Sequence, residues 1–334
     1  MKKTENRPFI CKPCGKDYLW GGRRLRDDLV KETEAERLAE SWECSTHPDG
    51  PSEAADGEYR GMELTEVLRL HPEYLGSHVR GMGGLAAGQI PVLVKFIDAK
   101  HDLSVQVHPT DAYADRHENG QQGKTELWYI MDAAKDAGIV CGLRRKADKE
   151  QLCGAALSRD LEKYLRRIPV EKDQVFLVEA GTIHAVGAGC LIAEIQENSN
   201  LTYRLYDYDR VDKDGRKREL HLEKALDAAD LTVGKELRQP LRVLRYEPGI
   251  ARELLGRCRY FEVHRMLVNT ERRQIVKFRA DELSFRILLC IEGCGTLTFE
   301  DRTVDIYRGD CVFVPADSVD IRIHGKLQFL DVRC

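Results

Sequence analysis

The stretch Asp102–Asp132, DLSVQVHPTDAYADRHENGQQGKTELWYIMD, predicts two strands that each carry a polar face. Its first part alternates aliphatic residues with Ser104, Gln106 and His108, and successive side chains of a strand point to opposite faces. Pro109 then ends the strand, because proline cannot donate to a sheet ladder, and we expect a polar loop rich in Gly, Asn and Gln to follow. One face of this first strand is therefore aliphatic and the other is polar.

A second strand is predicted over Lys124–Ile130, where Lys124 and Glu126 share a face with a tryptophan. If the polar faces of the two strands meet, an amide, an imidazole and a carboxylate come together from Gln106, His108 and Glu126. That set of side chains suits a divalent metal such as zinc. The alternative is that each polar face simply faces water, as it does in many antiparallel sheets.

A further candidate ligand lies downstream in EAGTIHAV, residues 179–186. Gly181 marks a tight turn there, and His184 follows on the next predicted strand. The run Ile192–Asn198 then alternates, so that Glu194 lies on a face that either meets solvent or lines a polar cavity. Another alternating run follows and contains Arg204.

Composition limits the classes of protein that fit. The chain has 334 residues, of which 42% are hydrophobic and 32% charged, as in a globular protein with room for two or three structural units. The net charge of -4 gives no sign of a nucleic-acid-binding surface. No apolar run approaches the roughly 20 residues of a membrane-spanning helix, and the N-terminus lacks the apolar core of a signal peptide. We therefore expect a cytoplasmic protein with neither a nucleic-acid nor a membrane partner.

The eleven cysteines are scattered and odd in number, which favours reduced thiols over a disulfide framework. Cys11 and Cys14 form the only CxxC pair. Such a pair can be redox-active or half of a zinc site, but without a second pair a purely structural role is the simpler interpretation.

Strand patterns dominate the chain, and helices interrupt them. The predicted helices cover residues 27–41, 62–71, 147–168 and 220–231. The predicted units are an N-terminal metal-binding unit (1–146 and 169–212), a helical excursion (147–168), a helix and polar connector (213–256) and a C-terminal unit (257–334).

The two units share an internal repeat. GDCVFVPA at 309–316 echoes KDQVFLVE at 172–179, and LLCI at 288–291 echoes LWYI at 127–130. The second copy is not expected to bind a metal, because isoleucines stand where the first has its ligands: Ile287 matches Glu126, and Ile321 matches His184.

One pair in the second copy does imitate the first. Glu262-Val-His264 has the spacing of Gln106-Val-His108. With both partner positions occupied by isoleucine, we expect this pair to bind nothing and the second unit to contribute packing and shape.

Several blocks in order resemble the type I mannose-6-phosphate isomerases (phosphomannose isomerases), which are zinc enzymes of the cupin superfamily. The blocks run from Tyr18 towards the C-terminus and are WGG, ESWECSTHPDG, PVLVKFIDA, LSVQVHP, GKTELWYI, AGTIHAVGAG and QENSNLTYRLYDYDR. The resemblance, closest to the short bacterial branch, implies a mainly β fold. It would consist of two cupin-like β-sandwich or jelly-roll units with helical insertions.

The same resemblance implies one zinc ion per chain. Its ligands fall on Gln106, His108, Glu126 and His184. The active-site arginine of the family falls on Arg204, and the lysine beside the zinc-binding glutamate falls on Lys124.

The implied reaction interconverts mannose 6-phosphate and fructose 6-phosphate by moving a proton between C2 and C1 through a cis-enediol. Arg204 suits either the enediolate or the phosphate, because its planar guanidinium stays charged. Lys124 is a candidate base or oxygen-polarising group, since burial lowers the pKa of a lysine. It is also a candidate phosphate contact. Glu194 is a rival base, and Ser104 is a candidate phosphate contact.

Two other classes of protein remain open at this point. One is a non-catalytic sugar-binding cupin. The other is a metal-dependent cupin oxygenase, which would favour mostly histidine ligands. We expect a sugar phosphate as the small-molecule partner and a monomer or weak homodimer.

Overall fold

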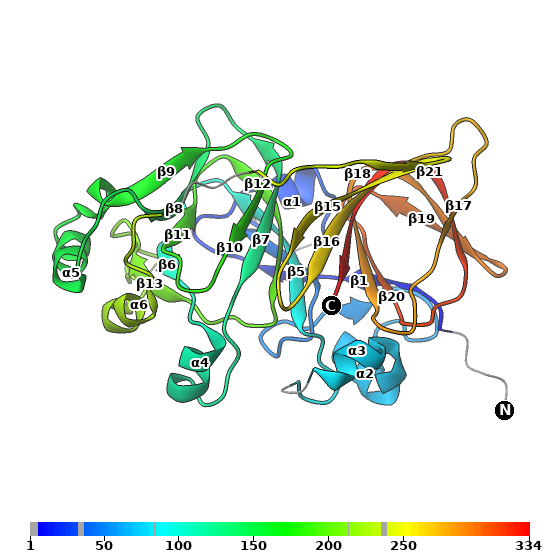
Figure 1. Cartoon of the computed structure of the whole chain (residues 1–334), viewed down its shortest axis with the longest axis horizontal. Helices are drawn as coiled ribbons and strands as arrows, with labels where there is room; N and C mark the ends of the chain where they lie inside the picture. Colours follow the sequence, from blue (N-terminus) through cyan, green and yellow to red (C-terminus); the bar gives the residue numbers. More distant parts are fainter. Residues whose placement is uncertain (1–5, 33–36, 83–84, 213, 235–238) are drawn as a thin grey trace.

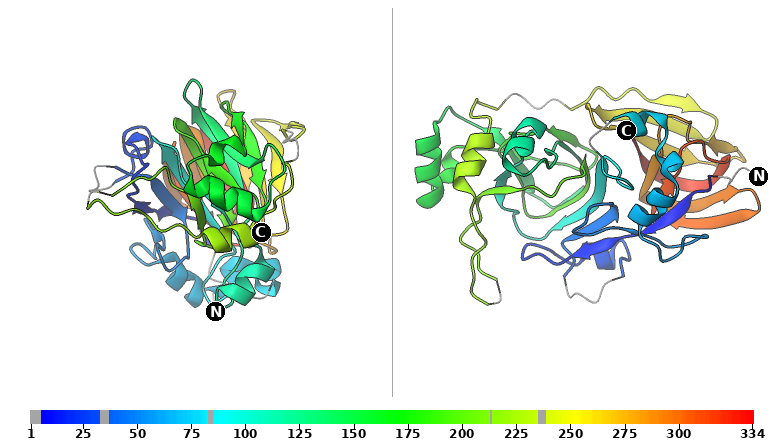
Figure 2. Two further views of the ribbon diagram at one scale, coloured as in Figure 1. Left: turned by 90° about the vertical axis from the view of Figure 1, so that its left-hand side faces the viewer. Right: turned by 90° about the horizontal axis from the view of Figure 1, so that it is seen from below.

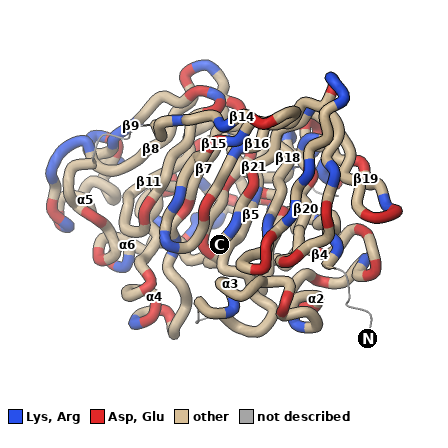
Figure 3. The backbone as a smooth tube through the Cα atoms, turned by 45° about the vertical axis from the view of Figure 1, so that its right-hand side comes forward, with Lys and Arg blue, Asp and Glu red and all other residues tan. Residues whose placement is uncertain are grey.

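The computed structural model describes residues 6–32, 37–82, 85–212, 214–234 and 239–334. The fold is mainly β, and its two units lie side by side along the long axis of the molecule (Figure 1 and Figure 2). Among the described residues, every helix is too short or too polar to cross a membrane. All eleven cysteines are free. Lys and Arg are interspersed with Asp and Glu over the part of the molecule seen in Figure 3.

The first unit is a sandwich of two antiparallel sheets. In spatial order, the larger sheet contains β10 (Val175–Val178), β7 (Glu126–Ala133), β12 (Cys190–Glu197), β5 (Val92–Ala99), β3 (Glu40–Cys44) and β2 (Cys14–Lys16). The smaller sheet contains β13 (Tyr203–Tyr206), β6 (Val105–Val107), β11 (His184–Val186), β8 (Gly138–Leu143) and β9 (Leu165–Pro169). Their facing sides enclose an apolar cluster that includes Trp128 from β7 and Val186 from β11.

The second unit is built from a ten-stranded sheet that folds around its own apolar cluster. Its strands are β14 (Arg245–Glu247), β15 (Ile250–Arg257), β16 (Glu262–Asn269), β17 (Val276–Phe278), β18 (Arg286–Phe299), β19 (Arg302–Tyr307), β20 (Cys311–Val314) and β21 (Ile321–Arg333), joined by β1 (Phe9–Lys12) and β4 (Glu53–Ala54). A third cluster joins the units, since Leu127 and Tyr129 of β7 pack with Val263 of β16 and Ile287 of β18.

Helices lie at the edges of the two units. α5 and α6 cover the far end of the first unit, and α2 and α3 lie below the second (Figure 1). The helices are α1 (Arg24–Asp27), α2 (Leu64–Leu70), α3 (Ser77–Gly81), α4 (Asp111–His117), α5 (Lys149–Leu157) and α6 (Leu222–Ala228), with 3-10 turns η1 (Pro72–Leu75) and η2 (Leu161–Lys163).

Two predicted helices are wrong in extent. Of the helix expected over 27–41, only Asp27 is helical among the described residues, as the last residue of α1, because Val30 adopts a left-handed backbone (φ 53°) and Glu40–Ser41 belong to β3. Residues 33–36 lie outside the described residues. The helix expected over 147–168 ends at Leu157, and Leu165–Pro169 form β9 because they pair with β8.

Two predicted irregular segments contain regular structure. The loop expected after Pro109 includes α4, whose first turn is capped by the Thr110 side chain accepting from the Tyr113 N–H. The polar connector expected up to residue 256 contains β14 and most of β15, both of which pair in the second sheet. Exposed, alternating polar residues there hid the strand pattern.

The internal repeat exists, but its register differs from the predicted one. Glu126 pairs with Val178 and points into the first unit, whereas Ile287 points into the cluster between units. The second-unit residue whose pairing matches that of Glu126 is Arg286, opposite Val314. A register change of one residue moves a side chain to the other face of a sheet.

The Glu262–His264 pair also lies on a different strand from the one predicted. β16 pairs with β21 in the same way that β5 pairs with β12, so this pair belongs to the counterpart of β5 rather than of β6. Glu262 lies 2.7 Å from His264 Nε2 and forms an ion pair with Arg333 at 2.5 Å.

Candidate metal centre and active site

Two strands of the smaller sheet and one of the larger sheet bring three ligand-type side chains together. His184 on β11 lies opposite Gln106 on β6, and His108 follows β6 directly. Glu126 opens β7 in the facing sheet. His108 Nε2 lies 3.3 Å from Glu126 Oε2, and His184 Nε2 lies 3.3 Å from the other carboxylate oxygen, Oε1. Among the described residues, this is the one group of His, Cys, Asp or Glu side chains close enough to share a metal ion.

Hydrogen bonds to the backbone fix which nitrogen of each histidine faces the group. Nδ1 of His108 lies 2.8 Å from the Leu201 carbonyl, and Nδ1 of His184 lies 2.8 Å from the Thr182 carbonyl. A carbonyl only accepts, so each Nδ1 carries the hydrogen and each Nε2 directs a lone pair towards Glu126. This is the tautomer that a metal-binding histidine needs.

Burial and charge set the protonation of the three side chains, each of which is at most 1% exposed. Burial, with the charge of Lys124, lowers the pKa of His108 to about 3. Burial likewise lowers the pKa of His184. Burial alone would raise the pKa of Glu126, but the charge of Lys124 is the chief influence that holds it well below its usual range. The group is therefore two neutral imidazoles and one carboxylate.

Several buried atoms of this group lack hydrogen bonds from the described residues. They are His108 Nε2 and both oxygens of Glu126. Lys124 Nζ lies 3.1 Å from Glu126 Oε2 in an ion pair. A buried carboxylate without hydrogen bonds is costly. Because a divalent cation would satisfy all of these atoms at once, the donor set fits a metal.

Gln106 borders the same group. Its amide nitrogen lies 3.3 Å from His184 Nε2, and its Oε1 accepts a hydrogen bond from Ser104 Oγ at 3.4 Å. Turning the amide by 180° exchanges its two ends and brings Oε1 to the side of the histidines. The structure thus brings together the four predicted ligands, with the amide oxygen of Gln106 currently facing Ser104.

A polar cavity of about 240 Å³ opens beside these residues. Its lining contains every predicted substrate and catalytic residue: Ser104, Lys124, Glu194 and Arg204. Ser104, Lys124 and Glu194 are all nearly fully buried. Burial lowers the pKa of Lys124 to about 8, even though Glu126 opposes that shift.

Sequence reasoning missed a buried charge network in this cavity. Lys95, in the middle of β5, lies 2.6 Å from Glu194 Oε2 and 3.3 Å from Glu40 Oε2. Indole N–H groups complete the network, from Trp128 to Glu194 and from Trp42 to Glu40, each at 2.7 Å. The available signal was a lysine inside the otherwise apolar run IPVLVKFI, since an unpaired lysine is almost never fully buried.

Sequence reasoning also missed Arg218, which lines the cavity with Arg204. Asp207 holds Arg218 through two hydrogen bonds, to Nε at 2.8 Å and Nη2 at 2.5 Å. Arg204 donates from Nη1 to the Glu219 carbonyl, while its buried Nε has no hydrogen-bond partner among the described residues. Burial, with the nearby Arg218 charge, lowers the pKa of Arg204. Two guanidinium groups thus face one small cavity.

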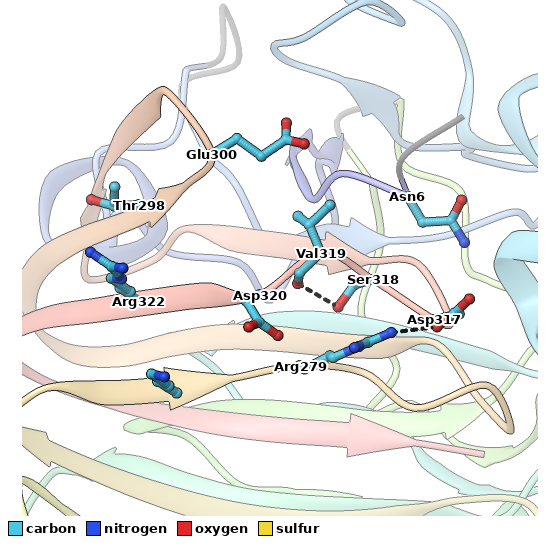
Figure 4. Close-up of a pocket in the computed structure, with 10 residues that line it drawn as sticks. Asn6, Arg279, Thr298, Glu300, Asp317, Ser318, Val319, Asp320 and Arg322 are labelled. Carbon is cyan, nitrogen blue, oxygen red and sulfur yellow. Dashed lines mark hydrogen bonds and ion pairs between the residues drawn. The ribbon is translucent and has the colours of Figure 1, made fainter. Parts of the chain in front are cut away.

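A larger hollow of about 530 Å³ lies on the second unit (Figure 4). Its lining includes Lys277, Arg279 and Arg322, which are exposed, and Arg279 is paired with Asp317 at 2.6 Å. This hollow lacks the converging buried groups of the smaller cavity. The smaller cavity is therefore the candidate active site, although it has less volume.

Known protein families match two parts of this chain. The family model for the catalytic domain of type I phosphomannose isomerases matches residues 9–136, and that for the cupin domain of mannose-6-phosphate isomerases matches 252–333. Mannose-6-phosphate isomerase ManA of Bacillus subtilis (strain 168) is 35% identical over 318 residues, covering 95% of this chain and 96% of ManA.

Two solved structures of mannose 6-phosphate isomerases are also similar to this chain. The mannose 6-phosphate isomerase from Bacillus subtilis has a TM-score of 0.87 and 36% identity, covering 98% of this chain and 99% of its own. A mannose 6-phosphate isomerase bound with zinc and yttrium shares the fold, with a TM-score of 0.72 at 14% identity over 97% of this chain and 98% of its own.

Proposed function

This chain belongs to the type I phosphomannose isomerases, and from that premise we propose that its cavity interconverts mannose 6-phosphate and fructose 6-phosphate in a zinc-dependent reaction. The observation that carries the proposal is the buried group of two neutral histidines and Glu126 beside a cavity with two arginines. An aldose–ketose isomerase needs such a combination, because it must bind an anionic sugar and stabilise negative charge on the sugar oxygens during proton transfer.

His108, Glu126 and His184 would hold one zinc ion per chain, and Gln106 would complete the set through its amide oxygen. When bound, zinc would supply Lewis-acid stabilisation of the enediolate oxygens. Support comes from the lone pairs aimed at Glu126 and from its buried oxygens, which lack hydrogen bonds. The zinc-bound relative with the same fold adds to that support.

Two groups in the cavity are suited to the proton transfer between C1 and C2. Glu194 pairs with Lys95, and a neighbouring ammonium favours the carboxylate form that can accept a proton from carbon. Lys124, with a pKa of about 8, is suited to hold or give a proton at a sugar oxygen near neutral pH. The roles of base at carbon and proton donor at oxygen therefore go to Glu194 and Lys124 respectively.

The phosphate would lie against Arg204 and Arg218. A guanidinium binds phosphate oxygens in a bidentate manner and stays charged. Asp207 holds the Arg218 guanidinium in place before substrate arrives, which reduces the entropy lost on binding. Ser104 Oγ, at the cavity wall, is a further hydrogen-bond donor to the phosphate or a sugar hydroxyl.

A coupled assay tests the proposal by following fructose 6-phosphate formed from mannose 6-phosphate. The assay is run on the purified protein, after EDTA treatment, and after zinc is added back. We expect activity to disappear with EDTA and to return with zinc. Stoichiometric zinc without turnover would instead support a sugar-binding protein. Bound iron with substrate-dependent oxygen uptake would support an oxygenase.

A further inference from the structure

We propose that Tyr260, a residue of the second unit, positions Lys124 in the active site of the first unit by fixing Asp111. The inference rests on the proposed function only in giving Lys124 a catalytic role. It assigns the second unit a part in the reaction, although that unit contributes no side chain to the cavity lining.

The segment that joins the ligands His108 and Glu126 closes on itself just before Lys124. The Lys124 N–H donates to the Pro109 carbonyl at 3.0 Å, and the Gly123 N–H donates to Asp111 Oδ1 at 2.9 Å. The two ends are in direct contact, since a Cβ on Gly123 would lie 2.4 Å from the Asp111 nitrogen. The backbone position of Lys124 therefore depends on the position of Asp111.

The other oxygen of Asp111 is held from the second unit. Tyr260 donates its hydroxyl to Asp111 Oδ2 at 2.6 Å. Tyr260 lies in the turn between β15 and β16, which a Cys258 N–H to Phe261 carbonyl bond closes at 3.0 Å. Phe261 is buried in the cluster between the units. The hydroxyl is thus attached to a fixed turn and reaches across to the loop.

A second carboxyl group completes the arrangement on the other side of Lys124. Glu197, at the end of β12 and 3% exposed, accepts the Thr125 N–H at 2.7 Å. Its carboxyl also interacts with that of Asp111, and burial together with the Asp111 charge raises the pKa of Glu197 to about 8. Protonated Glu197 and the Tyr260 hydroxyl thus each offer a hydrogen-bond donor to the Asp111 carboxylate.

The consequence is that the backbone N–H groups of both neighbours of Lys124, Gly123 and Thr125, donate to carboxyl groups, and that Tyr260 holds the one that belongs to Asp111. The Lys124 side chain is about 5% exposed and its Nζ is 3.1 Å from Glu126. Small displacements of a catalytic group reduce rate sharply, on the order of a hundredfold for 1 Å. Removing the Tyr260 hydroxyl, which belongs to the second unit, should therefore slow the reaction in the first unit.

The test is Tyr260→Phe, which keeps the ring and removes only the donor. We expect kcat to fall roughly tenfold, within the range expected for misplaced groups. KM for mannose 6-phosphate and zinc content should stay unchanged. Tyr246→Phe, at an exposed tyrosine of the same unit, is the matched control and should keep full activity.

A double-mutant cycle with Asp111→Asn distinguishes an effect of Tyr260 that acts through Asp111 from a general loosening of the loop before Lys124. If Tyr260 acts through Asp111, the double variant should be no slower than the slower single variant. Losses in kcat that multiply would overturn the proposal, and so would an unchanged kcat in Tyr260→Phe.

Amide hydrogen exchange gives a readout that does not depend on activity. Tyr260→Phe should speed exchange within residues 109–125, and Tyr246→Phe should not. Unchanged exchange in Tyr260→Phe would overturn the positioning even if the wild-type protein showed no isomerase activity. An active wild-type protein with an unaffected Tyr260→Phe variant would leave the proposed function standing and remove this inference alone.

Discussion

Lys95 and Glu194 are directly opposite each other on β5 and β12, and their charged groups meet at 2.6 Å inside the first unit. Both side chains are less than 8% exposed, so the pair is shielded from water. Removing one partner of a buried pair leaves an uncompensated charge, which costs about 3–5 kcal/mol.

Lys95→Met should therefore lower the free energy of unfolding by about 3–5 kcal/mol and reduce kcat, because Glu194 loses the cation that favours its carboxylate form. Urea denaturation and the isomerase assay measure the two effects. Lys172→Met, at a half-exposed lysine paired with Glu292, is the control.

Adding Glu194→Gln to Lys95→Met should recover part of the stability without recovering activity. A double variant that regains full turnover would show that Glu194 takes no part in the proton transfer.

Removing the metal should destabilise the protein because the Glu126 carboxylate stays buried. A ligand in hundredfold excess over its Kd stabilises a protein by about 2.7 kcal/mol. Wild-type protein in zinc should thus lose stability of this order on EDTA treatment. Glu126→Gln should show no such shift and bind no zinc by atomic emission, whereas Glu219→Gln, at an exposed carboxylate, should behave like wild type.

The pH dependence of stability should contain a contribution from Glu197. Its pKa is raised from 4.5 to about 8, chiefly by burial and then by Asp111, so the folded form keeps a proton that the unfolded chain loses. The stabilisation of the folded protein by protonated Glu197 is complete below the pKa of this group in the unfolded chain. It is lost as the pH rises towards 8, at up to about 1.4 kcal/mol per pH unit.

Glu197→Gln imitates the protonated carboxyl and removes this dependence. Its free energy of unfolding should match that of wild type near pH 5 and exceed it at pH 8, with urea denaturation as the measurement. Equal stabilities at both pH values would show that Glu197 is ionised in the folded protein.

Arg218→Ala should raise KM for mannose 6-phosphate more than it lowers kcat, because the side chain is assigned to the phosphate. A lost charged hydrogen bond costs roughly 1.5–3 kcal/mol, which corresponds to about a 10- to 150-fold change. Arg210→Ala is the matched control, since Arg210 also pairs with Asp207 but does not line the cavity. An equal rise in KM in both variants would mean that Asp207, not the phosphate contact, explains the effect.

The ligand candidates were visible in the sequence because each lies on or beside a short strand with a regular alternation. Alternation placed Gln106 and His108 on one face, and the structure brings them to Glu126 and His184. Lys95 was not found, since an apolar run predicts burial but does not show which partners neutralise a charge inside it. Arg218 was not found because it approaches Arg204 only when the segment after β13 turns back.

The errors in the fold have similar causes. The charged run after Asp27 has helical composition, but pairing of Glu40 and Ser41 with β5 overrides it. The repeat was aligned by residue similarity, which does not detect a one-residue difference in register. Pairing with β20 reveals that Arg286, not Ile287, takes the place of Glu126.

The pairing of β1 with β20 joins Phe9 to Phe313. β1 is therefore synthesised long before β20, and it cannot form this pairing until β20 has left the ribosome. During that interval its backbone donors and acceptors lack their final partner, and such edges favour association with other chains. A fragment that contains β1 but stops before β20 would keep this edge unpaired, so we expect a chain truncated before Cys311 to aggregate rather than form a small, independent enzyme.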